Sequence, residues 1–471
     1  MSEVVVIGNG PTAHRLVERL RHHGHQDTIT VLGAETRPAY NRVLLASVLR
    51  RTLHPEAVTL PDLPAGTRVR LGVIAVGIDR PQCLVHTDDQ VDYHYDELVL
   101  ATGARPRIPD LPGVLTADGH LADGVTTLRT LADCERISKG AVVVLGGGAL
   151  GTEAALGLLA SGHRVTLVHP HDYPMNRHLD ATGGRLLADH LNKLGVGMQL
   201  GRKAVEYTLG KLFLDDGQVL KTDTLLLCTG VTPEAELARD VGLAVHRGVV
   251  VDDRLRTNDP HIHAIGDCAE YAGNVPGLLG PAWDQAETLA KLLTGGHAHY
   301  RGTRLITRLK APSIDVASLG SLEDLINPDA KVELVTLSDR TCGRYAKLAL
   351  CDQRITGAVL LGFPQAIASI SQLYDRNLPV PSDRLRLLLG TAAIRTAPVE
   401  LPDEAVICHC NNVTKKALLR AWQGGTREIP ELAEATRATT GCGSCAPEVR
   451  RICDLFQSTA ESEIVGRDSS P

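Results

Sequence analysis

The sequence has few aromatic residues and no strong excess of charge of either sign. Aromatics make up 3% of the 471 residues, and 49 Lys and Arg against 55 Asp and Glu give a formal net charge of −6. A chain without a basic field or stacking platforms has little with which to hold nucleic acid. We therefore expect no nucleic-acid partner.

Long apolar runs are also missing. No stretch reaches the ~18 residues of a membrane span, and the opening MSEVVVIGNG enters a strand-like run without the basic and apolar regions of a signal peptide. We expect no membrane association and a cytoplasmic location, where the 11 cysteines are buried thiols plus a metal or redox site rather than disulfides. The length predicts roughly three domains.

A glycine loop follows the first predicted strand. Val4 to Ile7 is a β-branched run typical of a buried parallel strand, and a helix-like segment, His14 to His22, comes after the loop. A strand, glycine turn and helix in this order hold a dinucleotide pyrophosphate against helix N–H groups. A second strand, Thr28 to Leu32, leads to Glu35, which is placed to accept bonds from a ribose. The predicted contact residues of the loop are Gly8, Gly10, Pro11, Thr12 and Ala13.

The same pattern returns about 140 residues later. A strand, Ala141 to Leu145, runs into a second glycine loop, and a third strand, Arg164 to Val168, ends at His169, where an adenosine-ribose acid is usual. No arginine cluster for a 2′-phosphate appears before Arg177, so we expect NADH rather than NADPH. Two dinucleotides on one chain indicate hydride transfer between a nicotinamide and a flavin. The predicted contacts of the second loop are Gly146, Gly148, Leu150 and Gly151.

Two similar stretches look like chain crossings between nucleotide domains. Leu98 to Pro106 and Leu225 to Pro233 each end a strand at a glycine, and Thr257 to Glu270 contains a strand that ends at Gly266-Asp267. With these features the chain resembles the FAD- and pyridine-nucleotide-dependent oxidoreductases of the glutathione reductase type. The resemblance implies that Asp267 contacts the flavin ribityl chain and that the FAD domain is split around the second nucleotide domain. Further cofactor contacts are predicted at Ala101, Thr102, Gly103 and Gly230.

The resemblance also gives roles to two charged residues. Glu153 would lie near the flavin–nicotinamide junction, or else be an ordinary exposed helix residue; Arg42 would touch the flavin or its phosphates, or else form a surface ion pair. Tyr40 to Leu49 lacks the C-x4-C pair of disulfide reductases. We therefore expect no redox disulfide and no acid or base catalyst. Buried core thiols are expected at Cys83, Cys134, Cys228, Cys268, Cys342, Cys351 and Cys453.

Four cysteines near the end of the chain form a metal-binding pattern. Soft thiolates suit zinc or an iron-sulfur cluster, and the single residue His409 between the first two is unusual for zinc. CHCNNVTKKAL and TTGCGSCAPEV are similar to the 2Fe-2S domain of the bacterioferritin-associated ferredoxin type. This resemblance favours a 2Fe-2S cluster over zinc, with His409 outside the ligand set. The implied ligands are Cys408, Cys410, Cys442 and Cys445.

The small cysteine domain has clear helix signals. Thr414 can cap a helix from Lys415 to Gln423, and prolines open a second helix at Pro430 and a third at Pro447.

The expected fold class of the whole chain is α/β, with two Rossmann-like dinucleotide-binding domains of the glutathione reductase type, a small mixed α/β domain and a small helical 2Fe-2S domain. The expected boundaries are 1–118 with 250–303 for FAD, 119–249 for NAD(P)H, 304–396 for the mixed domain, 397–403 for a linker, 404–457 for the cluster domain and 458–471 for a tail.

Taken together, Tyr40-Asn41-Arg42, GGGALGTEAA, VTLVH and the cysteine domain resemble the N-terminal half of NADH-dependent assimilatory nitrite reductase large subunits. In that family a histidine commonly follows the strand, as His169 does here. No sirohaem domain follows Cys445, so the resemblance is to a separate electron-transfer subunit of assimilatory nitrate reductase. The implied partner is a catalytic molybdenum nitrate reductase or a nitrite reductase. The alternatives are a ferredoxin or rubredoxin reductase with another acceptor, and a cluster-bearing docking or redox-sensing module.

Overall fold

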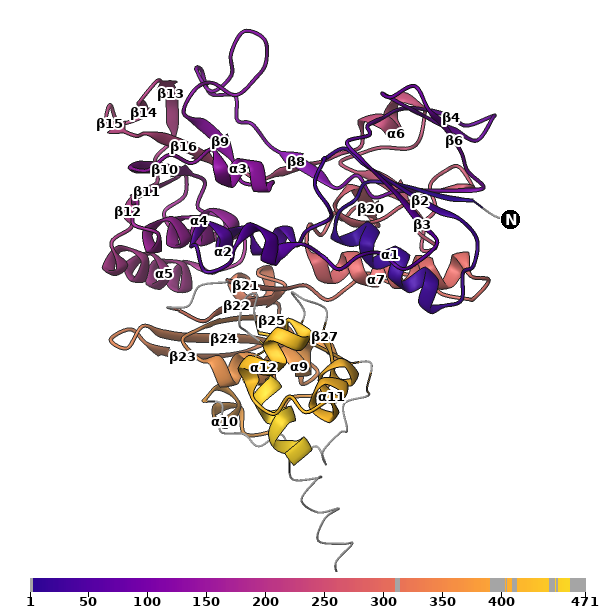
Figure 1. The fold of residues 1–471 in the computed structure, drawn as a ribbon. Helices are drawn as coiled ribbons and strands as arrows, with labels where there is room; N and C mark the ends of the chain where they lie inside the picture. The colour runs from indigo at the N-terminus through magenta and orange to yellow at the C-terminus, as the bar shows by residue number, and fades with distance from the viewer. Residues whose placement is uncertain are drawn as a thin grey trace, which may run out of the picture.

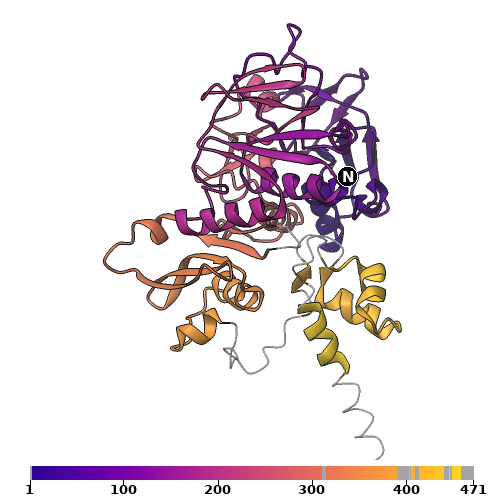
Figure 2. The same ribbon diagram turned by 90° about the vertical axis from the view of Figure 1, so that its left-hand side faces the viewer.

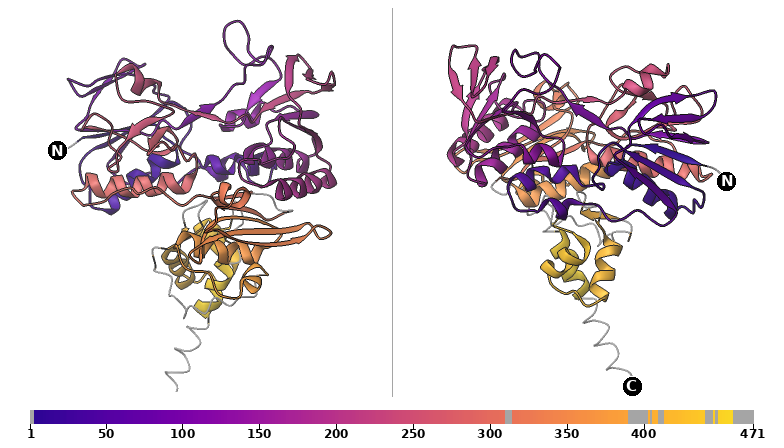
Figure 3. Two further views of the ribbon diagram at one scale, coloured as in Figure 1. Left: turned by 180° about the vertical axis from the view of Figure 1, so that it is seen from behind. Right: turned by 45° about the horizontal axis from the view of Figure 1, so that its top comes forward.

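The computed structural model describes residues 3–309, 314–389, 403, 405–408, 413–439, 445 and 448–457. Two parallel sheets lie side by side, and an antiparallel sheet and a small helical domain lie beneath them (Figure 1). The expected α/β fold class is confirmed. Figure 3 shows the same arrangement from behind, where the antiparallel sheet and the small helical domain again lie beneath the two halves, and with the top of the molecule turned forward.

The first parallel sheet is built around the N-terminal strand. All four residues of that strand are buried, because parallel neighbours pair on both sides and helices cover the sheet. The last strand of the sheet comes from residues 262–264, so the chain returns here after building the second sheet. The order is β19-β7-β1-β2-β3, with β1 Val4–Ile7, β2 Ile29–Gly33, β3 Thr67–Leu71, β7 Glu97–Leu100 and β19 Ile262–Ala264.

Helix α1 (Pro11–His22) leaves the first glycine loop and packs against α7 (Leu279–Leu293). It begins three residues before the expected His14, because proline is well suited to the first turn of a helix. Smaller elements come from the same stretches of chain, and two of them, at residues 42–49, pack against the core around the second parallel sheet. The smaller elements are η1 Arg42–Leu44, α2 Leu45–Leu49, η2 Pro55–Val58, β4 Ala75–Asp79, β5 Leu84–Thr87, β6 Asp92–His94, α6 Glu236–Asp240, β18 Val249–Val251, η3 Gly266–Cys268 and β20 Ala269–Tyr271.

An ion cluster joins α1 to α7. Glu287 of α7 pairs with Arg19, with His23 at 3.1 Å and with Lys291 at 3.1 Å. Burial raises the pKa of Glu287, but the hydrogen bond and charge of Arg19, with hydrogen bonds from Lys291 and His23, outweigh burial and bring the pKa to about 2, against an ordinary value of 4.5. The cluster therefore stabilises the folded state only while Glu287 is ionised.

Glu287→Gln is expected to lose stability at neutral pH but little at low pH. The folded-state pKa lies below the unfolded one, so the stabilisation is complete above about pH 4.5 and is lost as the pH falls toward about 2. Allowing for solvent screening, we expect a loss of about 1 kcal/mol at pH 7. Urea midpoints of both proteins at pH 7 and pH 3 measure it. Glu135→Gln, which breaks the exposed pair with Arg37, is the control and should change little; an equal gap at both pH values would contradict the assignment.

The second parallel sheet repeats the design of the first. Its central strand β10 is buried from Val142 to Leu145. The strand is again followed by a glycine loop and a helix, α4 (Ala149–Ala160). The order is β12-β11-β10-β16-β9, with β9 Val125–Thr127, β10 Ala141–Leu145, β11 Arg164–His169, β12 Gly197–Leu200 and β16 Thr224–Leu227. Helices α3 Leu131–Glu135 and α5 Ala181–Leu194 and the antiparallel strands β13 Ala204–Thr208, β14 Lys211–Leu214 and β15 Val219–Lys221 complete it.

The two stretches expected to cross between the sheets pair with each other. β8 (Ala104–Pro106) and β17 (Val231–Pro233) are antiparallel, with Val231 opposite Pro106. This two-stranded ribbon is visible between the two halves in Figure 1. It places the ends of β7 and β16, and the glycines after them, on the same side of the molecule.

The third sheet is antiparallel and is attached to the second half. Its order is β21-β22-β25-β24-β23, with β21 Ile306–Leu309, β22 Val316–Gly320, β23 Glu333–Asp339, β24 Arg344–Cys351 and β25 Arg354–Leu361, and with helices α8 Glu323–Ile326, α9 Pro364–Asp375 and α10 Arg384–Leu388. Tyr345 donates a 2.5 Å hydrogen bond to the buried Asp180 at the start of α5. Contrary to expectation, Cys342 is exposed, because it lies in the turn between β23 and β24, and the other single cysteines that are only partly buried are Cys83, Cys134 and Cys351.

The cysteine domain has an apolar core of its own. The Thr414 side chain accepts a hydrogen bond from the Ala417 N–H at the start of α11 (Lys415–Gln423), as expected. The other elements are β26 Val406–Cys408, β27 Val413–Thr414, α12 Ile429–Thr436 and a helix at 448–457. Figure 2 shows this domain, in yellow, beneath the indigo N-terminal part and apart from the orange sheet. Of the expected linker, only Asp403 is among the described residues.

Candidate functional site

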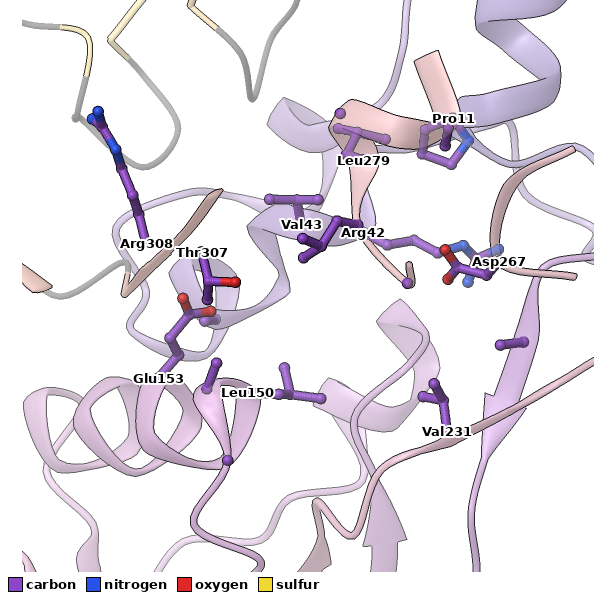
Figure 4. Close-up of a pocket in the computed structure, with 18 of the residues that line it drawn as sticks. Pro11, Arg42, Val43, Leu150, Glu153, Val231, Asp267, Leu279, Thr307 and Arg308 are labelled. Atoms are coloured by element: carbon purple, nitrogen blue, oxygen red, sulfur yellow. The ribbon is translucent and has the colours of Figure 1, made fainter. Parts of the chain in front are cut away.

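One cavity of about 2790 Å³ connects the two parallel sheets. It is well above the ~1,000 Å³ upper range of a site for one drug-sized ligand, so it has room for two dinucleotides. Figure 4 shows side chains from the two halves on opposite walls, with Arg42 and Asp267 on one side and Leu150 and Glu153 on the other. Both glycine loops line this space.

The first glycine loop presents free backbone groups to the cavity. Gly8 has a φ of +114°, and a Cβ there would lie 2.2 Å from the carbonyl oxygen of Ala101, so only glycine fits. Gly10 is different, because a Cβ there would meet no described atom within 4 Å. Gly10 caps α1 without any side-chain hydrogen bond. Helix N–H groups that face open space are suited to bind the FAD pyrophosphate.

The second loop has the same geometry. Gly146 has a φ of +114°, and a Cβ there would lie 2.3 Å from the carbonyl oxygen of Cys228. A Cβ at Gly148 would meet no atom of the described chain within 4 Å, whereas one at Gly151 would lie 1.9 Å from the carbonyl oxygen of Gly146. Gly148 therefore leaves room for a ligand, and Gly151 lets α4 pack closely on the loop. The second loop is therefore suited to hold the pyrophosphate of NAD(P)H, in the same way as the first loop is suited to hold that of FAD.

His169 supports the second loop from the side. Its Nδ1 accepts a 3.0 Å hydrogen bond from the Gly147 N–H, so its proton is on Nε2, which donates to Asn176 Oδ1 at 3.1 Å. Burial lowers the pKa of His169 and keeps the ring neutral. A Cβ at Gly147 would lie 2.8 Å from the ring. The histidine therefore holds the loop through Nδ1 and is itself held through Nε2 by Asn176, rather than offering an acceptor to a ribose as an acid would.

Glu35 and Arg42 form one polar cluster on the wall of the first half. Arg42 pairs with Glu35 and donates to the Tyr40 hydroxyl at 2.9 Å, and that hydroxyl donates to Glu35 at 2.8 Å. Burial, partly offset by the Arg42 charge, raises the pKa of Tyr40 to about 12, so the hydroxyl stays protonated. Glu35 is thus fixed in place after β2, where a ribose acceptor is needed.

Arg129 is a site residue that the sequence did not indicate. Its guanidinium donates to Asp267 at 2.7 Å and to the carbonyl oxygen of Ala104 at 3.0 Å, and all three residues line the cavity. The backbone carbonyl of Arg129 also accepts a hydrogen bond from Arg42 at 3.0 Å. Arg129 and Asp267 are 138 residues apart in the chain, so only the folded structure brings them together.

Glu153 is 4% exposed, which excludes the alternative of an ordinary exposed helix residue. It lines the cavity one turn into α4, close to Thr307 in Figure 4. Burial lowers the pKa of the Arg50 guanidinium, and the nearby charge of Glu153 opposes that change. A buried carboxylate beside a cation at the end of α2, on the wall of the cavity, is suited to orient a bound ligand.

The structure brings most of the predicted cofactor residues to this one cavity. Those that line it are Gly8, Gly10, Pro11, Thr12, Glu35, Arg42, Ala101, Thr102, Gly103, Gly146, Gly148, Leu150, Glu153, His169, Gly230 and Asp267. Two others do not line it. Ala13 is fully buried in the core of the first half, and Gly151 packs against Gly146.

The cysteine site is described at two of its four positions. Cys408 and Cys445 are 0% and 6% exposed and belong to the same small core, and Cys445 also lines the cavity. Cys410 and Cys442 lie outside the described residues, and within the described ranges no group of three or more His, Cys, Asp or Glu is arranged to hold a metal. Two buried thiols in one core fit the soft-ligand requirement of a 2Fe-2S cluster.

Comparison with known proteins gives the family. Residues 2–286 match the family described as pyridine nucleotide-disulphide oxidoreductase. The chain belongs to this family. Residues 306–377 match the rubredoxin NAD+ reductase C-terminal domain, and residues 406–454 match the BFD-like 2Fe-2S binding domain. The protein is therefore an oxidoreductase with FAD, NAD(P)H and a 2Fe-2S cluster as cofactors, and the expectation of iron-sulfur rather than zinc is confirmed.

Two relatives from Bacillus subtilis (strain 168) match nearly the whole chain. Nitrite reductase (NAD(P)H) is 32% identical over 98% of this chain and 59% of its own length, and the assimilatory nitrate reductase electron transfer subunit is 32% identical over 99% and 61%. The chain thus spans about three fifths of the length of these relatives. The solved putidaredoxin reductase–putidaredoxin complex has the same fold, with a TM-score of 0.74 and 24% identity over 83% of this chain and 99% of that one. Among the described helices, none is long and apolar enough to cross a membrane.

Proposed function

We propose that this family member carries electrons from NADH, through FAD and the 2Fe-2S cluster, to a separate catalytic nitrate or nitrite reductase unit. The observation that carries the proposal is that Cys445 lines the same cavity as the two glycine loops. The nicotinamide, flavin and cluster sites then open on one space. The names of the two Bacillus relatives support a nitrogen-oxide reductase as the acceptor.

The residues of the chain would bind and orient the cofactors, without acid or base catalysis. Bound FAD supplies the conversion between two-electron hydride chemistry and the one-electron chemistry of a cluster. The loop at Gly8 and Gly10, with Glu35, would hold its adenosine and pyrophosphate, and Asp267 held by Arg129 would fix the ribityl chain. The loop at Gly146 and Gly148 would place NADH so that its nicotinamide meets the flavin beside Glu153.

The experiment is anaerobic mixing of the purified protein with NADH, followed by addition of a candidate acceptor. NADH is expected to bleach both the flavin bands and the broader iron-sulfur absorbance. Nitrate reductase with nitrate, nitrite reductase with nitrite, and oxidised rubredoxin are then added in separate reactions, and the return of the absorbance is followed. Reoxidation by a molybdenum nitrate reductase or by a nitrite reductase supports the proposal. Reoxidation by neither would contradict it.

A rubredoxin or ferredoxin reductase is the second candidate. The observation in its favour is the match of residues 306–377 to the C-terminal domain of rubredoxin NAD+ reductase. The cluster domain on this chain argues against it, because that domain already provides a one-electron carrier next to the cavity. Fast reoxidation by rubredoxin alone would favour the second candidate.

A further inference from the structure

Arg437 is the residue that reaches from the cluster domain to the flavin half. It ends α12 in the left-handed region, with a φ of +64°, and its backbone N–H closes the helix on Ala433. Its side chain leaves the small domain. One guanidinium nitrogen donates to the carbonyl oxygen of Thr59 at 2.6 Å, and the other donates to that of Ala57. The planar fork of arginine is well suited to two neighbouring acceptors.

The acceptors of Arg437 are fixed to the wall of the cavity. Thr59 forms a β-bridge with Tyr40, and the Asn41 N–H donates to the carbonyl oxygen of Val58 at 2.7 Å. Val58 is fully buried, so this segment has little freedom to move. Tyr40 in turn donates to Glu35 inside the cavity. A cluster domain held at residues 57–59 is therefore held at a constant position relative to the flavin site.

A second contact lies closer to the cysteines. Val43, which lines the cavity in η1, packs against the apolar core of the small domain, and that core includes Cys408 and Cys445. An apolar contact of this kind excludes water but sets orientation weakly, because it is not directional. The two hydrogen bonds of Arg437 are directional. They fix how the domain is turned about the Val43 contact.

We propose that Arg437 is a positioning residue that docks the cluster domain on residues 57–59 so that Cys445 faces the flavin cavity. The inference rests on the proposed function, and it names the intramolecular contact on which electron passage from flavin to cluster depends. Because both acceptors are backbone carbonyls, the docking site is a matter of local backbone shape and needs no particular side chain at 57 or 59. Its effect is on the rate of transfer between the two sites, not on either cofactor.

The test uses Arg437→Asn, because asparagine tolerates the left-handed backbone and is too short to reach the two carbonyl groups. Rapid mixing with NADH under anaerobic conditions resolves flavin reduction from cluster reduction by absorbance. We expect an unchanged rate of flavin reduction, unchanged iron and flavin content, and a rate of cluster reduction lower by about tenfold or more, the factor given by about 1.4 kcal/mol of lost docking free energy. Arg437→Lys should recover part of the rate, because an ammonium can still donate to one carbonyl.

Arg427→Ala is the matched control, since Arg427 lies in the same domain over the Trp422 ring at 4.8 Å and should leave every rate unchanged. An unchanged rate of cluster reduction in Arg437→Asn would overturn the inference, as would an equal loss in Arg427→Ala. If the cluster of the unaltered protein is not reduced by NADH at all, the proposed function fails instead. Magnetic coupling between one-electron-reduced flavin and reduced cluster, measured by electron paramagnetic resonance, should weaken in Arg437→Asn and stay constant in Arg427→Ala.

Discussion

Cys445→Ser is expected to give a protein whose flavin is still reduced by NADH but whose iron-sulfur absorbance is lost. Cys445 is 6% exposed and shares a core with Cys408. A hydroxyl is a harder and less acidic ligand than a thiol. Loss of groups that only support metal ligands costs roughly 10–100-fold, so turnover with the physiological acceptor should fall by roughly 100-fold or more. Iron analysis and an acceptor assay measure the two effects.

The same small core provides the matched control. Cys453 is 7% exposed in that core, and burial raises the pKa of its thiol, so it remains a neutral packing group. Cys453→Ser should therefore keep the cluster and lose only a little stability. The assignment would be wrong if Cys445→Ser kept its iron, or if Cys453→Ser lost as much. Reduction of the flavin by NADH checks that the rest of the protein is intact in both variants.

Gly8→Ala is expected to destabilise the flavin half strongly. The added Cβ would lie 2.2 Å from the carbonyl oxygen of Ala101, in backbone that is unfavourable for any other residue at a φ of +114°. Strain and the backbone clash together should cost about 3 kcal/mol or more. Because β1 and β7 pair immediately before these two residues, the sheet cannot widen locally to relieve the clash. The urea midpoint and the flavin content should both fall.

Gly10→Ala separates flavin binding from folding. The backbone at Gly10 has a φ of −95°, which alanine adopts freely, and the new methyl group would meet no atom of the described chain within 4 Å. The methyl group would instead occupy the space that the FAD pyrophosphate is proposed to fill. We expect a urea midpoint near that of the unaltered apoprotein and a flavin-to-protein ratio well below it. Equal stability of Gly8→Ala and Gly10→Ala would contradict the distinction between the two glycines.

Features with a local cause could be predicted from the sequence. The glycine loops follow their strands because a buried β-branched run and a tight turn are both short-range properties, and α11 begins at its Thr414 cap and ends where expected at Gln423. The stretches that contain β8 and β17 were expected only to cross between domains. The structure adds that the two strands pair, with Val231 opposite Pro106.

Contacts between distant parts of the chain could not be predicted. Arg129 lies in a stretch without a motif and meets Asp267 across 138 residues, and Arg437 meets Thr59 across 378. The role of His169 also depended on the fold, because the same residue at the end of a strand can face a ribose or turn back to the loop. The hydrogen bond from the Gly147 N–H to His169 shows that the ring turns back to the loop. No pattern in the sequence records the direction of a side chain.

The small domain has a separate core, yet Val43 and Arg437 attach it beside the flavin cavity. When a reductase and its electron carrier are separate proteins, their concentrations limit how often the two meet. A carrier on the same chain is present at an effective concentration on the order of millimolar, whatever the level of expression. Dilution should therefore slow only the encounter with the proposed external acceptor. Electron transfer from flavin to cluster within the chain should be as fast in a dilute cell extract as in a crowded cell.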